Sequence, residues 1–127
     1  METILVRQLA DYLSVPVIVF DPGQIAIFYN EPAERLLGVR FAETGRITPD
    51  QADELIEVSA GPTAPPGNAP RPVVIALEER RPAHARRWVR RRGDGVRLEV
   101  EITAFPLIGQ GDALLGAVVM FWERHGT

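Results

Sequence analysis

The sequence predicts an α+β fold, in which two short strands precede a helical middle and three strands follow it. Three observations support this order: a β-branched run at 17–20, a capped helix between Asn30 and Gly38, and two strand-like segments around the glycines at 93–95. The chain has 127 residues, of which 46% are hydrophobic. That length and composition allow one core, so we expect a single domain.

The first residues read as a helix followed by a hairpin. Within 2–13, apolar residues recur at the spacing of an amphipathic helix. The run at 17–20 and the apolar run at 25–29 read as two strands, joined by an Asp-Pro-Gly turn. The expected division of the chain is a flanking helix at 1–13, a domain at 14–123 and a tail at 124–127.

A short helix follows the second strand, and its two ends are marked by the residues that favour helix termini. Asn30 can accept a backbone hydrogen bond from the first turn, which makes it a good N-cap. Pro32 falls in that first turn, where a missing N–H costs nothing. Gly38 can adopt the left-handed conformation that ends a helix. The segment therefore predicts a compact strand–cap–helix unit.

The middle of the chain predicts two more helices. Thr48 and Gln51 have the spacing of a capping box and open a short helix that includes Leu55. Residues 61–71 are too rich in proline and glycine for regular structure. A further helix is expected over 72–81. We expect a connector without regular structure at 40–46.

The last third predicts three strands, over 86–92, 96–105 and 114–122, with a turn at 106–111. Two hairpin loops fit the glycines between the first two. A three-residue loop with Gly95 left-handed pairs Trp88 with Val100 on the inner face. A two-residue turn places Trp88 outside instead. We prefer the first loop because it buries the larger side chain.

Composition excludes much catalytic chemistry. The chain has no cysteine, so disulfides, thiolate metal sites and cysteine nucleophiles are absent, and with no lysine there is no Schiff-base chemistry. Two histidines are too few for a multi-histidine metal site. No apolar stretch reaches about 18 residues and the N-terminus lacks a basic signal, so we expect a cytoplasmic protein that does not span a membrane.

Charge is unevenly distributed, although the net charge is only −3. Eight arginines crowd into 80–97, where glutamates such as Glu79 and Glu101 can pair with them, so we expect a paired strand face and no nucleic-acid binding. Asp50, Asp53 and Glu54 share the short helix after Thr48. They could form a carboxylate or metal site, but an acidic first turn favoured by the helix dipole explains them without chemistry.

The element order and three motifs resemble those of PAS domains. These motifs are the strand ending in Tyr-Asn before the helix that closes at Gly38, the Asp94-Gly95 hairpin, and the segment 103–108 leading to 115–118. The resemblance covers about residues 14–123. It implies a five-stranded antiparallel sheet with helices on one face and a flanking helix in front. It also implies a sensory or interaction module of a signalling protein, not an enzyme.

The resemblance also bears on cofactors. Flavin photosensors of this family use a cysteine-containing helix motif, and this chain has no cysteine. Haem-binding relatives place an axial histidine on the helix before the third strand, which corresponds here to 72–81 and has no histidine. His84 lies just beyond it and reads as the start of a strand. We therefore expect neither haem nor a tightly bound flavin, while a small organic ligand remains possible.

We expect a mostly hydrophobic pocket between the 72–81 helix and the inner sheet face. Its candidate residues are apolar side chains from different elements that should converge there: Val19, Phe28, Phe41, Leu55, Ile75, Trp88 and Val100. Trp88 could stack on a flat ligand or simply fill the core.

The sequence thus predicts a PAS-type sensory module that binds or responds to a small organic ligand and acts on a signalling partner in trans. A ligand-free interaction or dimerisation module is the alternative, and a small cone-shaped α+β enzyme using the acidic helix is a third. Both alternating faces of 114–122 are apolar, so both must be covered. We expect a homodimer through residues 2–13 and the outer sheet face.

Overall fold

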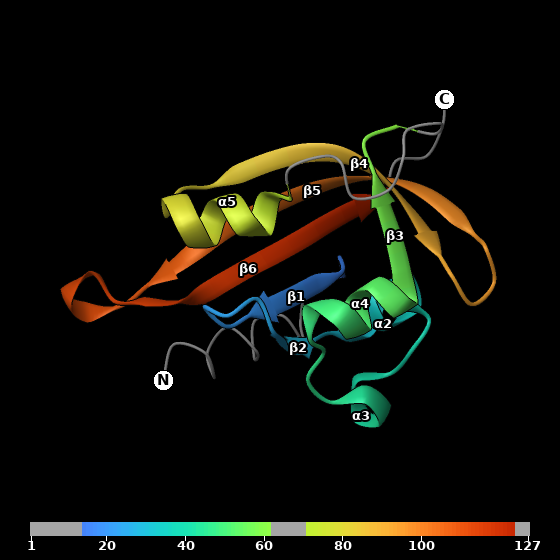
Figure 1. Ribbon diagram of the computed structural model, residues 1–127, viewed down its shortest axis with the longest axis horizontal. Helices are drawn as coiled ribbons and strands as arrows, with labels where there is room; N and C mark the ends of the chain where they lie inside the picture. The colour runs from blue at the N-terminus through green and yellow to red at the C-terminus, as the bar shows by residue number, and fades with distance from the viewer. Residues whose placement is uncertain (1–13, 62–70, 124–127) are drawn as a thin grey trace.

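The computed structural model describes residues 14–61 and 71–123, and its centre is a six-stranded antiparallel sheet in the order β2-β1-β6-β5-β4-β3 (Figure 1). The elements are, in chain order, β1 (Val17–Phe20), β2 (Ala26–Tyr29), α2 (Glu31–Leu37), α3 (Phe41–Thr44), α4 (Pro49–Leu55), β3 (Ile56–Ser59), α5 (Pro72–Glu79), β4 (Ala83–Arg91), β5 (Arg97–Ile108), the 3-10 turn η1 (Gln110–Asp112) and β6 (Leu114–Glu123). The expected helix over 2–13 lies outside the described residues. The α+β prediction is confirmed.

The two faces of the sheet carry different apolar clusters. The larger cluster includes Ile18, Val119 and Phe121 and packs against α2 and α5, so it defines the inner face. Helix α5 contacts β5, β6 and β4 on this side (Figure 1). Val118 lies on the outer face and is also buried, at 4% exposed. The middle of β6 is therefore buried on both faces, while Trp122 near its end is 38% exposed on the outer face.

Helix α2 has the ends that its sequence predicts. The Oδ1 atom of Asn30 accepts a hydrogen bond from the Ala33 N–H at 3.1 Å. Gly38 has a φ of 82° and its N–H donates to the Glu34 carbonyl. Asn30 does more than cap the helix, because it is only 2% exposed and also bonds Val15 and Val17. The capping side chain therefore fastens α2 to the start of β1.

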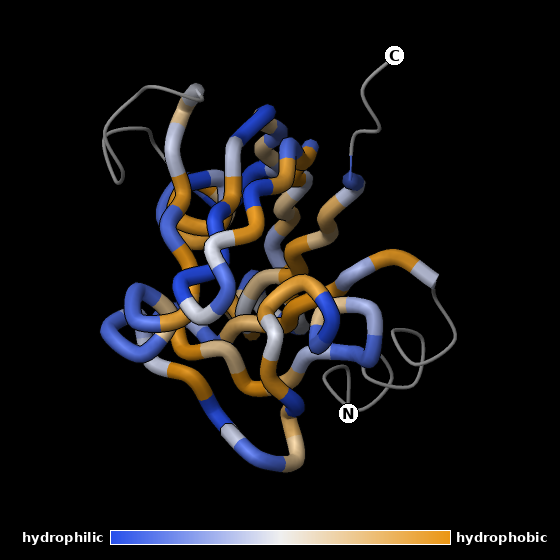
Figure 2. The backbone as a smooth tube through the Cα atoms, turned by 90° about the vertical axis from the view of Figure 1, so that its right-hand side faces the viewer, coloured by the Kyte–Doolittle hydropathy of each residue, from blue (hydrophilic) through white to orange (hydrophobic). Residues whose placement is uncertain are grey.

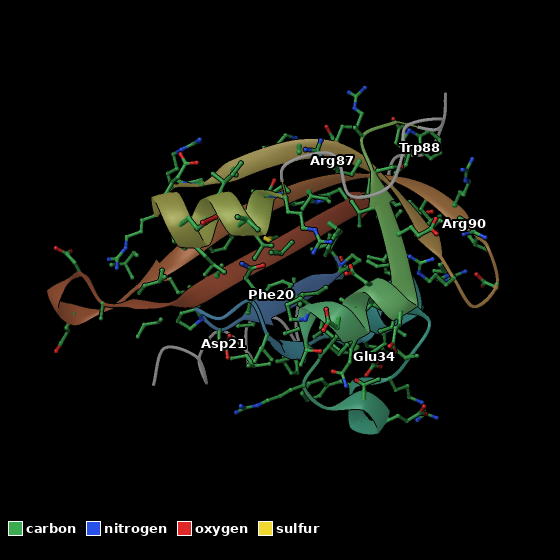
Figure 3. The ribbon with its side chains drawn as sticks, in the orientation of Figure 1. Phe20, Asp21, Glu34, Arg87, Trp88 and Arg90 are labelled. Carbon is green, nitrogen blue, oxygen red and sulfur yellow. The ribbon has the colours of Figure 1, made fainter. Side chains whose placement is uncertain are left out.

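The connector expected at 40–46 contains a short helix, α3. The Glu34 carboxylate accepts the Phe41 N–H at 2.8 Å, so a side chain from α2 satisfies a donor at the start of α3 (Figure 3). Helix α4 opens with the predicted capping box, since the Thr48 side chain and Gln51 exchange hydrogen bonds.

The sheet has six strands instead of the expected five, because β3 follows α4 without a loop. Ile56 directly follows α4, begins β3 and pairs with Arg91 of β4. Strand β5 also runs through Pro106 to Ile108, where we expected a turn. Pro106 is tolerated there because β4 ends opposite Ala104, so its missing N–H faces no strand on that side.

The β4–β5 hairpin uses neither of the two loops we considered. Arg91 pairs with Val96 across a four-residue loop, with Gly95 left-handed at a φ of 73°. The hydrogen bond from the Val96 N–H holds the pKa of Asp94 below its usual range. The resulting register places Trp88 opposite Glu99, so the preferred pairing of Trp88 with Val100 was wrong.

Most of the clustered arginines have carboxylate or carbonyl partners, as expected, but several partners differ from those expected. Arg81 pairs with Glu79, whereas Arg91 pairs with Asp94 inside the hairpin. Arg86, not Arg87, faces Glu101 across the strands. Figure 2 shows short hydrophobic and hydrophilic stretches alternating along the backbone. None of the helices in the described ranges has the length and apolar character needed to cross a membrane.

Candidate functional site

A cavity of about 360 Å³ lies between the inner face of the sheet, helix α4 and the start of α5. Its volume falls within the range of small-molecule sites. The sheet contributes apolar side chains from β1, β5 and β6, namely Ile18, Ile102, Val119 and Phe121. The opposite side includes Ala52 and Leu55 of α4 together with Pro72 and Val73 of α5. The cavity is thus a mostly apolar, partly open space bordered by elements that are distant in the sequence.

One end of the cavity is lined by Tyr29, which is 1% exposed. Its hydroxyl lies 2.7 Å from the Thr44 hydroxyl and 3.3 Å from the Val39 carbonyl. Burial raises the pKa of Tyr29, so the phenol stays neutral well above physiological pH. Phe41 contacts the Tyr29 ring edge to face at 5.3 Å. These contacts fix the ring, which therefore acts as a rigid wall.

The rim of the cavity carries ion pairs. Arg71 and Asp53 are 3.1 Å apart, which links the residue before α5 to α4. Glu57 of β3 pairs with Arg92 at 2.6 Å and with Arg90 at 3.2 Å. These pairs are partly exposed, so each contributes little to stability. They link α4 to the residue before α5, and β3 to the end of β4, at one side of the opening.

Arg87 is a charged residue that the register of the β4–β5 hairpin turns onto the inner face. It lines the cavity and pairs with Val100, a fully buried residue of the inner cluster. Its Nη1 donates to the Arg86 carbonyl at 2.8 Å. Figure 3 labels Arg87 with its neighbours Trp88 and Arg90 along β4. A guanidinium therefore borders an otherwise apolar stretch of the sheet.

The structure brings together only part of the predicted pocket set. Leu55 lines the cavity. Val100 lies on the same inner face but is 0% exposed and does not line it, and Ile75 is a partly buried residue of α5 outside the lining. Val19 and Phe28 face each other on the outer side of the sheet.

Phe41 also stands apart from the cavity. The centroid of its ring lies 5.4 Å from that of Phe28, in the outer cluster, and 5.3 Å from that of Tyr29, in the inner cluster. Phe41 therefore packs against both clusters beside β2. The contact is edge to face in both cases. Phe41 thus supports a cavity wall without lining the cavity.

Trp88 requires a correction. It is partly buried on the outer face of β4, because its neighbour Val89 occupies the inner face at 1% exposed. The four-residue loop sets this orientation. Trp88 can therefore neither stack on a ligand in the cavity nor fill the core there, and its truncation should cost less than the loss of a buried aromatic residue.

Neither the carboxylates nor His84 of the described residues form a cluster of metal ligands. No three histidine or carboxylate side chains gather as metal ligands in 14–61 and 71–123. His84 lies on the outer face of β4, where its Nδ1 is 2.8 Å from the Thr103 hydroxyl and its Nε2 is 3.6 Å from Glu101. It points away from the cavity. Of the acidic residues of α4, Asp53 pairs with Arg71 at the rim of the cavity.

Several lining residues escaped the sequence analysis. Phe20, Tyr29 and Phe121 belong to strands that we identified, and strict alternation from the buried Val119 would have placed Phe121 on the inner face. Arg87 could not be found in this way, because its orientation depends on a loop length that the glycines leave open. Phe20 and the neighbouring Asp21 turn are labelled in Figure 3.

The sequence matches no family model and no curated protein. Solved structures do share the fold. The PAS domain of BvgS from Bordetella pertussis is 16% identical with a TM-score of 0.69, over 99% of this chain and 88% of that one. A LOV protein from Rhodobacter sphaeroides is 16% identical with a TM-score of 0.72, over 98% of this chain and 68% of that one.

The PAS domain of nitrogen regulation protein NR(II) from Vibrio parahaemolyticus is 17% identical with a TM-score of 0.63, over 94% of this chain and 98% of that one. At these identities the likeness establishes the fold. The chain therefore has the fold of PAS domains over nearly its whole length, as its motifs predict.

Proposed function

We propose that this chain is a PAS-type sensory module whose inner cavity binds a small, largely apolar molecule and whose response passes to a signalling partner in trans. The observation that carries the proposal is the 360 Å³ cavity on the inner face, lined mostly by apolar side chains. A filled core would leave no such space. The PAS fold of the chain supports a sensory role over an enzymatic one.

Native mass spectrometry of the purified protein tests whether a ligand is bound. We expect an added mass that disappears on denaturation.

The same preparation should show neither a Soret band nor flavin absorption, because the chain has no cysteine and His84 faces away from the cavity. A haem or flavin spectrum would contradict the cofactor part of this proposal.

Filling the cavity should remove the bound ligand. Ala52 of α4 lines the cavity, so Ala52→Phe adds a ring to the space that the ligand occupies. We expect the added mass to be lost while circular dichroism shows an intact fold. Ala42→Phe on α3 is the matched control, because Ala42 is exposed and does not line the cavity. Retention of the ligand by Ala52→Phe would place it elsewhere.

We further propose a homodimer through residues 2–13 and the outer sheet face. The outer sheet face supports this, because it carries an apolar cluster separate from the inner one, and Trp122 of β6 is 38% exposed there. Light scattering should give twice the monomer mass for the intact chain and the monomer mass after deletion of 1–13. A monomeric mass for the intact chain at micromolar concentration would exclude this assembly.

The alternative proposal is a ligand-free interaction or dimerisation module. The same outer face favours it, since an exposed apolar side chain such as that of Trp122 needs no ligand to bind a partner. The two proposals differ in the native mass spectrum, because the alternative predicts no added mass. It also predicts that Ala52→Phe leaves the dimer mass in light scattering unchanged.

A further inference from the structure

We infer that the Gln24 side chain binds the polar end of the ligand, and that this ligand joins an apolar body to a head group that both donates and accepts a hydrogen bond, as a primary amide does. The inference rests on the proposed function and names the class of ligand. It starts from the backbone of Gln24, which lines the cavity. Its φ is 67°, in the left-handed region that residues other than glycine and asparagine rarely adopt.

The turn between β1 and β2 holds Gln24 in this conformation. The Asp21 carboxylate accepts the N–H groups of Gly23 and Ile25 at 2.9 and 3.0 Å (Figure 3). The Asp21 carbonyl accepts the Gln24 N–H at 3.0 Å. The glycine of this turn, Gly23, precedes the left-handed position and has no positive φ itself. A glycine at position 24 would relieve the strain, so the turn does not explain why a glutamine side chain is present there.

The side-chain amide of Gln24 is available to a ligand. No group in 14–61 and 71–123 forms a hydrogen bond with it, whereas the Gln51 side chain accepts the Thr48 N–H. Gln24 is partly buried at the edge of an apolar space. A side-chain amide carries a carbonyl acceptor and an NH₂ donor, so it can form two hydrogen bonds with one head group.

A second polar side chain borders the same end of the cavity. Ala26 and Ile47 exchange backbone hydrogen bonds at 2.9 and 3.0 Å. Gln24 and Thr48 each lie within two residues of this bridge, and both line the cavity. Thr48 is exposed, so this end is open to water. The Thr48 hydroxyl accepts the Gln51 N–H and still has its own O–H to donate.

The rest of the cavity limits the size and polarity of the ligand. Its 360 Å³ corresponds to about a dozen water volumes at ~30 Å³ each, which suits a ligand with roughly as many non-hydrogen atoms. Side chains such as Ile18, Val119 and Phe121 offer the ligand no hydrogen bonds. A head group that only accepts hydrogen bonds would leave the Gln24 carbonyl without a partner, whereas an amide satisfies both groups of Gln24.

Calorimetric titration with two neutral probes of equal size tests the inference. The probes are phenylbutyramide and the methyl ketone in which a CH₃ group replaces its NH₂, so that the ketone accepts a hydrogen bond but donates none. Gln24→Leu keeps the shape of the side chain and the backbone strain and removes the amide. We expect it to weaken binding of the amide relative to the ketone by about fivefold, the effect of one hydrogen bond.

Two further variants locate the effect. Gln110→Leu makes the same change on the exposed turn η1, outside the cavity, and should leave the relative affinity for the two probes unchanged. Gln24→Gly removes the side chain and the strain together. It should raise the midpoint of urea denaturation and shift the relative affinity as Gln24→Leu does.

The outcomes separate this inference from the proposed function. An equal shift in relative affinity for Gln24→Leu and Gln110→Leu, or a shift in neither, would overturn the role of Gln24 and leave the ligand-binding proposal standing. Gln24→Gly with the relative affinity of the intact protein would overturn it too, because that variant has no side-chain amide. Failure of both probes to bind the intact protein would contradict the proposed function, and this inference with it.

Discussion

Replacing Asn30 with alanine should destabilise the domain by about 3–5 kcal/mol, a large part of the stability of a typical domain. The Asn30 side chain accepts from the Val17 N–H at 3.0 Å and from the Ala33 N–H, and it donates to the Val15 carbonyl at 2.9 Å. The residue is 2% exposed, so water cannot replace these bonds. Urea denaturation followed by circular dichroism measures the loss.

Thr48 provides a matched control because it also caps a helix. Its side chain accepts from the Gln51 N–H, but Thr48 is exposed and bonds only within its own helix start. Thr48→Ala should therefore cost about 1 kcal/mol. A loss for Asn30→Ala no larger than that for Thr48→Ala would show that Asn30 only caps α2 and does not fasten it to β1.

The parts of the fold that the sequence could predict are those set by local chemistry. Helices α2 and α4 begin at Asn30 and Thr48 because each capping side chain satisfies an N–H three residues later. Strand β3 could not be predicted in this way. Its four residues follow α4 directly, and they form a strand because β4 lies beside them to supply the hydrogen bonds.

The candidate site was less predictable, because the faces of its strands depend on how distant segments pair and not on local sequence alone. Placing Trp88 in the pocket followed from burying the larger side chain, but the four-residue loop reverses the faces of β4 and turns Arg87 inward instead. The glycines at 93–95 permit loops of several lengths, and each change of one residue exchanges the faces. Leu55 does line the cavity, and the capping box that begins α4 at Thr48 is a local signal.

The second large effect is expected at Gly116 of β6. A Cβ atom at this position would lie 2.1 Å from the Phe20 carbonyl oxygen and 3.4 Å from the Asp21 Cα, and both of these are backbone atoms. The φ of Gly116 is also 147°, a conformation that other residues rarely adopt. Neither the contact nor the dihedral can relax without moving the end of β1. We therefore expect Gly116→Ala to cost at least about 3 kcal/mol in urea denaturation.

Two other glycines allow the cost of the close contact to be measured separately from the cost of the backbone dihedral. Gly95 has a φ of 73° but nothing within 4 Å of its Cβ position, so Gly95→Ala should cost about 1 kcal/mol through strain alone. Gly93 has open space and no left-handed φ, and Gly93→Ala should be nearly neutral. If Gly116→Ala costs no more than Gly95→Ala, the close approach to Phe20 is not rigid. Because Phe20 lines the cavity, the displacement of β1 expected in Gly116→Ala should also reduce the added mass that native mass spectrometry detects, whereas Gly93→Ala should leave it unchanged.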